Sequence, residues 1–462
     1  MYRIPRTPAW PGRCSQVVAV AALSATAFLA PAIPASADAP PPLSGTVSAS
    51  GPHIMGERWL TERTLQLTVA TDAFAAPALV EVIFPVGYNA DSTKKWPVTY
   101  YTAGTTHDEM SFRTIYNGEA LTASYPSIVV APRGDSGYWS DWFNTGTAGP
   151  PEYETFVMNQ LIPLIDANFR TIPDRAHRAI MGESMGGYGA LMFTARHPDK
   201  FAAAASLSGA VDSNWAPGAG AITASPTLQG AAPDSIYGPR ATEEVRWRGH
   251  NPTDLARNLR GVDLQLFTGN GVPDLVRESG LADSSGCATE AGVIRPESVR
   301  LHQTLLALDI SHGWQDESWG CHSPAQFQDQ IAQAIERFQN VFSRRTTAPT
   351  VFDHTSIEPS FDIYGWKITA DPQRPLEFLT LEDVSANGLT ITGSDTTTIT
   401  TPPLFSGAKP VFVTIDGKPT RVQPDKNGAI TFSVPQGPPN QQQQYTLGAT
   451  TKHSTTTVTF NR

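Results

Sequence analysis

A tight turn between a buried strand and a helix is the feature that most restricts the fold of this chain. Gly182-Glu183-Ser184-Met185-Gly186 follows the short apolar segment 177–181 and precedes the helical pattern of 188–197. Small residues at both ends let the backbone turn so sharply that a serine side chain projects clear, at the positive end of the following helix. Such a turn predicts a parallel sheet covered by helices, with Ser184 as a nucleophile and the Met185 N–H beside a developing oxyanion.

Strand and helix patterns alternate on both sides of this turn. Short apolar or alternating segments predict strands, and apolar residues spaced by three or four predict helices. The predicted strands cover 64–69, 80–84, 96–101, 127–131, 177–181, 201–207 and 263–267, and the predicted helices cover 153–169, 188–197, 296–308 and 324–342. Because alternating strands and helices form a mostly parallel sheet with helices on both faces, we expect an α/β domain over residues 57–343.

The composition changes after the last predicted helix. A short linker at 344–350 leads into a Thr-rich region without a convincing helix, 351–462. Asn387-Gly388, Asp416-Gly417 and Asn427-Gly428 lie next to alternating segments, and these dipeptides are the strongest short signals of a β-hairpin. We therefore expect a small all-β, sandwich-like domain at the C-terminus.

The N-terminal region predicts export. Basic residues precede an apolar run at 17–30, and Ala35-Ser36-Ala37 follows it. This run is shorter than the roughly 20 residues that cross a bilayer, and the whole pattern is typical of a secretory signal peptide. We expect a signal peptide at 1–37, a flexible leader at 38–56 and an extracellular mature protein.

Charge and cysteine content restrict the partners. The formal net charge is −10 and no basic tract occurs, so we expect neither a nucleic-acid partner nor an anionic membrane surface. Removal of the signal leaves Cys287 and Cys321, and two cysteines in an oxidising compartment predict one disulfide. No Cys/His cluster has metal-ligand spacing and no glycine-rich phosphate loop occurs, so we expect no metal and no cofactor.

A nucleophilic serine needs a base and an acid, which in this kind of fold follow it in the order serine, acid, histidine. His322 lies directly before the final predicted helix, and we favour it as the base over His312. Asp274 lies just past the last predicted strand, and Glu297 lies at the start of the next predicted helix. Either carboxylate would orient the imidazole and stabilise the imidazolium, and spacing alone slightly favours Asp274.

The α/β region resembles the antigen 85 mycolyltransferases and the wider esterase D-like putative esterases, in particular their secreted actinobacterial members, over about residues 58–340. The matching motifs are the turn around Ser184, Ser140-Asp141-Trp142, Ala204-Ala205-Ser206-Leu207-Ser208-Gly209, Gly269-Asn270-Gly271-Val272-Pro273 and Gly320-Cys321-His322-Ser323. The resemblance implies an α/β-hydrolase fold. It also implies that the acid lies on the helix after the Gly-Asn-Gly loop, at the position of Glu297. On the resemblance we therefore favour Glu297 over Asp274 as the acid. The second oxyanion N–H would come from Thr105, in the loop after the third strand.

Some residues of the family are missing. Its trehalose-binding members carry an aspartate and an arginine where this chain has Ala103 and Thr106, and a tryptophan where it has Pro324. Mycolyl transfer to trehalose is therefore in doubt, whereas acyl-enzyme chemistry is unaffected, and water becomes the expected second nucleophile. Gly134-Asp135-Ser136-Gly137 is similar to the active-site string of trypsin-like proteases, but it follows a buried parallel strand and is expected to be a non-catalytic loop.

These features predict a secreted serine esterase that hydrolyses carboxylic esters through an acyl-enzyme on Ser184. The ester would belong to a small molecule, a lipid or a polymer. One alternative is an acyltransferase that moves the acyl group to a cell-envelope alcohol. An alternative of another class is a non-catalytic protein whose C-terminal region binds a cell-envelope or polymer surface. The intact set of serine, histidine and acid argues against this alternative.

Overall fold

The structure is a computed structural model that describes residues 51–88, 93–143, 151–344, 346–406 and 409–461. The predicted signal peptide at 1–37 and the predicted leader up to residue 50 lie outside these residues. Within the described part, no helix is both long and apolar enough to cross a bilayer.

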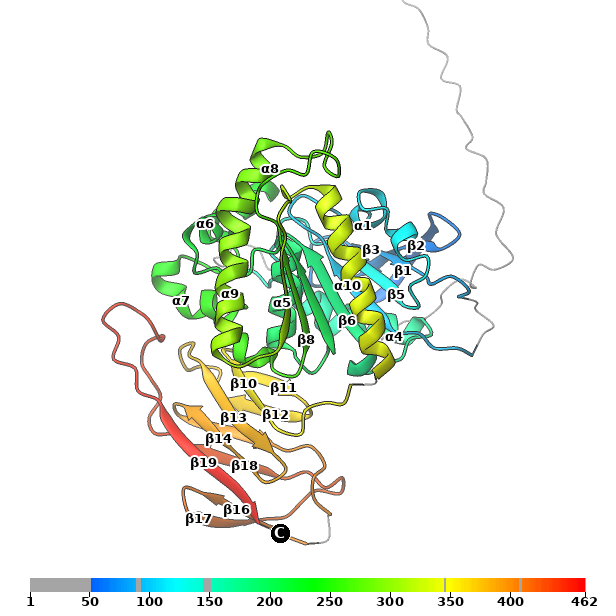
Figure 1. The fold of residues 1–462 in the computed structure, drawn as a ribbon. Coiled ribbons are helices and arrows are strands. Elements are labelled where there is room, and N and C mark those ends of the chain that lie inside the picture. Colours follow the sequence, from blue (N-terminus) through cyan, green and yellow to red (C-terminus); the bar gives the residue numbers. More distant parts are fainter. Residues whose placement is uncertain (1–50, 89–92, 144–150, 345, 407–408, 462) are drawn as a thin grey trace, which may run out of the picture. The chain divides into compact units, whose positions relative to one another are not determined.

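A nine-stranded sheet forms the centre of the α/β region (Figure 1), in the order β1-β2-β3-β5-β4-β6-β7-β8-β9. Its strands are β1 (His53–Trp59), β2 (Thr64–Ala70), β3 (Ala78–Ile83), β4 (Val98–Thr102), β5 (Ile128–Pro132), β6 (Arg178–Glu183), β7 (Ala203–Leu207), β8 (Asp263–Thr268) and β9 (His312–Asp316). All pairs from β5 to β9 in this order are parallel, and the pairs from β1 to β5 are antiparallel. The mostly parallel sheet confirms the predicted α/β fold class.

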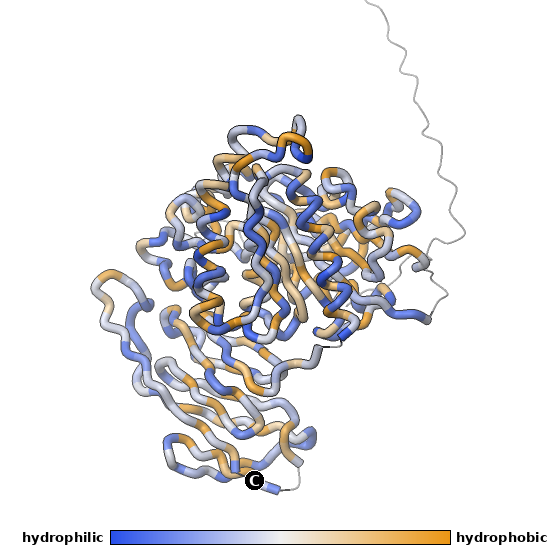
Figure 2. Tube along the Cα trace, viewed as in Figure 1, coloured by the Kyte–Doolittle hydropathy of each residue, from blue (hydrophilic) through white to orange (hydrophobic). Residues whose placement is uncertain are grey.

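Helices cover both faces of this sheet. The helical segments are α1 (Ser111–Thr114), α2 (Gly118–Leu121), α3 (Tyr153–Thr155), η2 (Phe156–Leu161), α4 (Ile162–Asn168), η3 (Arg175–His177), α5 (Met185–Arg196), α6 (Ala216–Ala224), η4 (Ser225–Gln229), α7 (Arg240–Gly249), η5 (Ala256–Leu259), α8 (Ser284–Thr289), η6 (Glu290–Ile294), α9 (Arg295–Ala307) and α10 (Pro324–Arg344). Both α5 and α10 pack on β6 and β7, from opposite faces. Along α9 and α10, hydrophobic and hydrophilic residues alternate (Figure 2), because each helix buries one side only.

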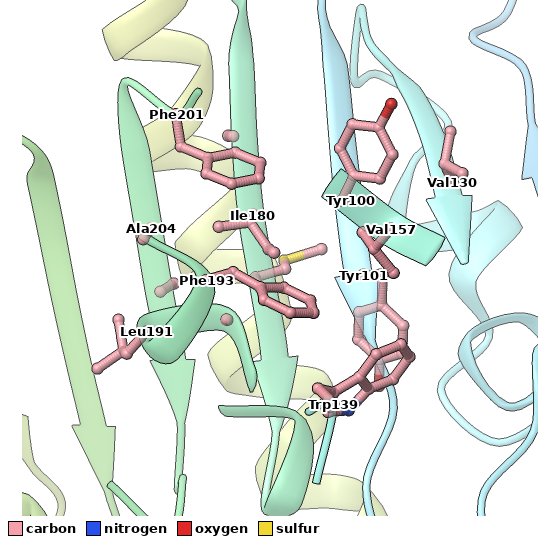
Figure 3. Close-up of a cluster of buried hydrophobic side chains, with 14 of the residues drawn as sticks. Tyr100, Tyr101, Val130, Trp139, Val157, Ile180, Leu191, Phe193, Phe201 and Ala204 are labelled. Carbon is pink, nitrogen blue, oxygen red and sulfur yellow. The ribbon is translucent and has the colours of Figure 1, made fainter. Parts of the chain in front are cut away.

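The strands at the centre of the sheet are buried along their whole length. Every residue of β4, β5, β6 and β7 is buried, as expected where helices cover both faces of parallel strands. Figure 3 shows Phe193 of α5 packed over the strand that carries Ile180. Trp139 meets Phe193 edge to face, with ring centroids 6.3 Å apart. This packing holds α5 on the sheet directly after the turn at Ser184.

Two antiparallel sheets follow the α/β region. One has six strands in the order β10-β13-β14-β19-β16-β17, and the other has four in the order β11-β12-β15-β18. The strands are β10 (Phe352–Ser356), β11 (Ser360–Ile363), β12 (Trp366–Ala370), β13 (Leu379–Ser385), β14 (Gly388–Gly393), β15 (Thr396–Thr400), β16 (Val411–Ile415), β17 (Lys418–Val422), β18 (Thr431–Pro435) and β19 (Ser454–Asn461). They enclose a hydrophobic cluster of their own. The predicted all-β region is confirmed, whereas its boundaries remain predictions.

Two of the three hairpin signals join paired strands. Asn387-Gly388 connects β13 with β14, and Asp416-Gly417 connects β16 with β17. Asn427-Gly428 does not, because β17 belongs to the six-stranded sheet and β18 to the four-stranded sheet. Gly428 has a φ of +92°, and a Cβ there would lie 2.0 Å from the Phe405 carbonyl oxygen. Close backbone approach, and not a hairpin, explains this glycine.

Two strands have no clear signal in the sequence. β1 begins at His53, inside the segment predicted as leader, and pairs with β2. β9 has the polar sequence HGWQD and lies at the edge of the sheet. Neither strand alternates cleanly between apolar and polar residues, so neither has the pattern that identifies a strand.

Candidate active site

The turn between β6 and α5 holds Ser184 in a backbone conformation that few side chains adopt. Ser184 has φ 55° and ψ −121° and directly precedes α5. A Cβ at Gly182 would lie 2.1 Å from Thr102 Oγ1, and one at Gly186 would lie 1.9 Å from the Thr102 carbonyl oxygen. Because β4 runs this close to the turn, the chain can pass only with glycine at both positions. The strained serine is therefore held by its neighbours.

Ser184 and His322 lie in direct contact, as the sequence predicts. The Nε2 atom of His322 is 2.8 Å from Ser184 Oγ, and its Nδ1 atom is 2.7 Å from Glu290 Oε2. An ionised carboxylate only accepts hydrogen bonds, so Nδ1 carries the proton and Nε2 accepts from the serine hydroxyl. The arrangement equips Ser184 for proton transfer to the imidazole.

The acid beside this histidine is Glu290, so the prediction of Glu297 is wrong. Glu297 Oε2 instead accepts the backbone N–H of Asp212 at 3.1 Å, and its other oxygen faces Gly218 on α6. The two glutamates are seven positions apart, and a π-helical turn, η6, lies between Glu290 and the start of α9. This wider turn separates their directions, so Glu290 meets His322 and Glu297 meets Asp212. Glu290 precedes the predicted helix of 296–308, and no pattern in the sequence singles it out.

Neither alternative, Asp274 for the acid or His312 for the base, takes part in the contact among Ser184, His322 and Glu290. Asp274 Oδ1 accepts the backbone N–H groups of Val276 and Arg277, so its carboxylate is used within its own turn. His312 begins β9 and lies at the amino end of that strand, whereas Ser184 follows the carboxyl end of β6. Its Nε2 atom is 2.8 Å from the Nδ1 atom of His302. Because β6 to β9 are parallel, the amino end of β9 and the carboxyl end of β6 lie at opposite ends of the sheet.

Glu290 is fully buried and held by groups at the ends of β7 and β8. Its Oε1 atom accepts the Gly269 N–H at 2.6 Å, the Ser208 hydroxyl at 2.8 Å and the Thr268 hydroxyl at 3.0 Å. Burial alone would raise the pKa of this carboxyl. The hydrogen bond and charge of His322, with the bonds from Gly269 and Ser208, lower the pKa below its usual value. Glu290 is therefore a buried, ionised acceptor that polar donors satisfy.

The backbone of His322 is fixed from two sides. Its N–H donates to Gln326 Oε1 at 2.7 Å, and Gln326 Nε2 donates to Ser208 Oγ at 2.6 Å. A disulfide joins Cys287 to Cys321, which confirms the predicted pair. It links the segment just before Glu290 to the residue directly before the histidine. The acid and the base are thus tied together covalently as well as by their hydrogen bond.

Two backbone N–H groups are available beside the serine. Met185 is the first residue of α5, so its N–H has no partner within the helix. Thr105 lies in the turn after β4, and its N–H donates no hydrogen bond to any other residue that the structure describes. A Cβ at Gly104 would lie 3.3 Å from Ser184 Cβ, so this turn packs directly on the nucleophile. Among the described residues, no group of three or more His, Cys, Asp and Glu side chains is arranged to hold a metal ion.

The chain matches the protein family described as "Putative esterase" over residues 73–337. It is 34% identical to Esterase Rv1288 of Mycobacterium tuberculosis over 196 residues, which is 41% of this chain and 42% of that protein. It is 32% identical to Diacylglycerol acyltransferase/mycolyltransferase Ag85A of Mycobacterium gordonae over 184 residues, which is 36% of this chain and 52% of that protein. The chain therefore spans about half the length of the curated relatives it matches. Among solved structures, MPT51 (FbpC1) of Mycobacterium tuberculosis aligns with a TM-score of 0.49 and 21% identity, covering 60% of this chain and 97% of that one.

The two glutamates give opposite expectations for the same substitution. Glu290→Gln removes the charge that stabilises the imidazolium, so we expect kcat for ester hydrolysis to fall roughly 10³- to 10⁴-fold. Glu297→Gln changes a carboxyl that does not touch the histidine, so kcat should stay within about threefold. Steady-state kinetics with a p-nitrophenyl ester measures both variants. A larger loss for Glu297→Gln would restore the original assignment of the acid.

Glu297 should also make stability depend on pH. Burial, together with the nearby Asp212 carboxylate, raises the pKa of Glu297 well above its usual value. In the folded protein the carboxyl is therefore protonated at pH values where it ionises on unfolding. Stability falls as pH rises from about 4.3, the unfolded pKa, toward the folded pKa, at roughly 1.4 kcal/mol per pH unit. Urea unfolding at pH 5, 7 and 9 should therefore show Glu297→Gln gaining stability relative to the unmodified protein as pH rises. A constant difference would mean that the buried carboxyl does not titrate in this way.

The turn at Ser184 gives a third prediction, with a second glycine as control. Gly186→Ala forces a methyl group against the Thr102 carbonyl, and such overpacking costs about 1–3 kcal/mol or more. Gly220, in the middle of α6, has open space around its Cβ position, so Gly220→Ala should stabilise the helix by up to about 1 kcal/mol. Thermal unfolding should therefore show Tm shifts of opposite sign. Equal Tm values for the two variants would contradict the close approach of β4 to the turn.

Proposed function

The chain belongs to the Putative esterase family, and on that premise we propose that it is an extracellular serine esterase. It would hydrolyse carboxylic esters through an acyl-enzyme on Ser184. The observation that carries the proposal is the hydrogen-bonded line from Ser184 Oγ through His322 to Glu290. The disulfide between Cys287 and Cys321 supports export, since disulfides persist in oxidising compartments.

The reaction begins with attack of Ser184 Oγ on the ester carbonyl carbon while His322 Nε2 takes the hydroxyl proton. The carbonyl oxygen becomes an oxyanion and accepts hydrogen bonds from the N–H groups of Met185 and Thr105. Collapse of this intermediate breaks the ester C–O bond, and His322 gives its proton to the departing alcohol. Water then attacks the acyl carbon while His322 Nε2 takes one of its protons. The bond between the acyl carbon and Ser184 Oγ breaks, His322 returns the proton to Oγ, and the carboxylic acid leaves.

Glu290 supports both proton transfers without being protonated itself. The imidazole becomes positively charged in each half-reaction, and the carboxylate lies 2.7 Å from Nδ1. Because its pKa is lowered, Glu290 stays ionised when the imidazolium forms. Little water surrounds this buried pair, so the attraction is stronger than it would be at the surface.

A small cavity beside Thr105 supports a preference for a limited acyl group. Its volume is about 250 Å³, and it is lined by Thr105, Tyr138, Ala221, Ala224, Ser225, Thr227 and Leu228. The alcohol must leave beside His322, which does not line this cavity, so the acyl side of the ester is the better occupant. A cavity of this size beside Thr105 favours acyl chains of short to medium length.

Acyl transfer is the second candidate, because the chain is 32% identical over 184 residues to a protein named as an acyltransferase. In that case an alcohol, and not water, would accept the acyl group from Ser184. Ala103 and Thr106 replace the charged residues that hold the sugar acceptor in the trehalose-binding relatives, which favours water. Docking of the C-terminal β region to a cell-envelope or polymer surface remains a prediction of the sequence.

Hydrolysis of p-nitrophenyl esters from acetyl to dodecanoyl tests the proposal. We expect Ser184→Ala to lower kcat at least roughly 10³-fold. Ser136→Ala should retain activity. Ser136 belongs to the string 134–137 that is similar to the active-site string of trypsin-like proteases, and it does not contact His322. The highest kcat/KM should fall at acyl chains of short to medium length and not at dodecanoyl, as the cavity beside Thr105 suggests.

The time course separates the two candidate functions. A burst of p-nitrophenol followed by steady turnover in water indicates a hydrolase. A burst that stalls until an alcohol is added indicates a transferase. Equal activity of Ser184→Ala and the unmodified protein on every ester would refute both.

A further inference from the structure

Glu183, the residue directly before Ser184, is a fully buried glutamate that the reaction above does not use. Its Oε1 atom accepts the Gly104 N–H at 2.6 Å and lies 2.9 Å from His107 Nδ1. The Tyr101 hydroxyl donates to Oε2, and the Tyr116 hydroxyl donates to Oε1 at 3.3 Å. Four donors from three segments of the chain thus converge on one carboxylate.

Two of these donors, Gly104 and His107, belong to the turn that carries Thr105, whereas Tyr101 lies in β4 and Tyr116 follows α1. The turn begins at Gly104 and ends at His107, whose N–H donates to the Gly104 carbonyl oxygen at 3.2 Å. Glu183 therefore binds both ends of the turn, and Thr105 lies between them. Thr106, at its tip, has a φ of 67°, a strained conformation that the surroundings must hold.

The same turn is anchored from its other side. Trp139 Nε1 donates to the Ala103 carbonyl oxygen at 3.1 Å. Figure 3 shows Tyr101 and Trp139 together at the end of the sheet that leads into the turn. With Trp139 on one side and Glu183 on the other, the backbone from Ala103 to His107 has little freedom to move.

The protonation states of the partners agree with this role. Burial, with the neighbouring Glu183, raises the pKa of Tyr101 and of Tyr116 well above the usual value, so both phenols remain O–H donors. The hydrogen bond to Glu183 raises the pKa of His107, partly offset by its burial. A buried carboxylate is costly unless donors satisfy it, and here two phenols, an imidazole and a backbone N–H do so.

We propose that Glu183 is a positioning residue for the oxyanion hole. Its carboxylate holds the turn from Gly104 to His107 so that the Thr105 N–H points to the oxygen of the tetrahedral intermediate. The inference rests on the proposed function of Ser184. Because a donor must lie about 2.7–3.1 Å from that oxygen, a small displacement of the turn would cost rate and leave substrate binding nearly unchanged.

Glu183→Gln tests the proposal, with Glu81→Gln as its matched control. Glutamine keeps the shape but turns one acceptor atom into a donor, which faces other donors in this site. Glu81 is another fully buried glutamate, paired with Arg113 at 3.1 Å, and it shares no hydrogen-bond partner with Glu183 among the described residues. Both variants are expected to lose some thermal stability, so stability alone does not separate a positioning role from a packing role.

The distinguishing measurement compares an oxoester with the matching thionoester. Sulfur is larger than oxygen and a weaker hydrogen-bond acceptor, so a thionoester draws little benefit from the oxyanion donors. For Glu183→Gln we expect kcat on the oxoester to fall roughly 10- to 100-fold, with KM within about threefold, while the thionoester rate changes little. Glu81→Gln should leave the ratio of the two rates unchanged.

Three results would overturn the inference. They are an unchanged oxoester kcat in folded Glu183→Gln, equal losses on both esters, and the same fall in the rate ratio for Glu81→Gln. If Glu183→Gln does not fold, Tyr116→Phe removes a single donor and should lower the rate ratio in the same direction by a smaller factor. Absence of Ser184-dependent hydrolysis in the unmodified protein would instead refute the proposed function, and this inference with it.

Discussion

The hydrogen bond between Glu290 and His322 is the interaction on which the site depends. It joins residues 32 positions apart, and it forms because β7 and β8 end, η6 begins and the segment before α10 passes at one edge of the sheet. The groups that bind Glu290 are themselves the last residues of strands or directly follow them. The disulfide beside both residues adds a covalent constraint on their separation. The packing at this edge of the sheet thus fixes the orientation of the His322 imidazole ring.

Three buried glutamates near Ser184 differ in their surroundings and therefore in their chemistry. Glu290 has a histidine and several donors, and its pKa is lowered. Glu183 has four donors and binds the turn of Thr105. Glu297 has one backbone donor and a nearby carboxylate, so its pKa is raised. Burial is common to all three, and the number and charge of the partners decide whether a glutamate supports the serine as an anion or remains a neutral part of the core.

Prediction from the sequence succeeded where a local pattern had one structural solution. The glycines around Ser184, the apolar strands and the Asp416-Gly417 hairpin are of this kind. It failed for the acid, because Glu290 lies in a π-helical turn before the predicted helix of 296–308, and both Glu290 and Glu297 precede the histidine in the chain. It also missed β1 and β9, whose pairing depends on neighbouring strands and not on their own composition.

The sequence by itself determined the strands from β2 to β8, the helix after Ser184 and the last helix of the α/β region, the serine at a tight turn, the histidine before that last helix and the pair of cysteines. Each of these follows from residues that are neighbours in the chain, where steric limits and hydrophobic periodicity act directly. Only the tertiary structure decided which carboxylate meets the imidazole and which groups hold the turn of Thr105 against the nucleophile. Those contacts join residues from different segments, and the packing at a shared sheet edge selects among side chains that are equivalent in the sequence.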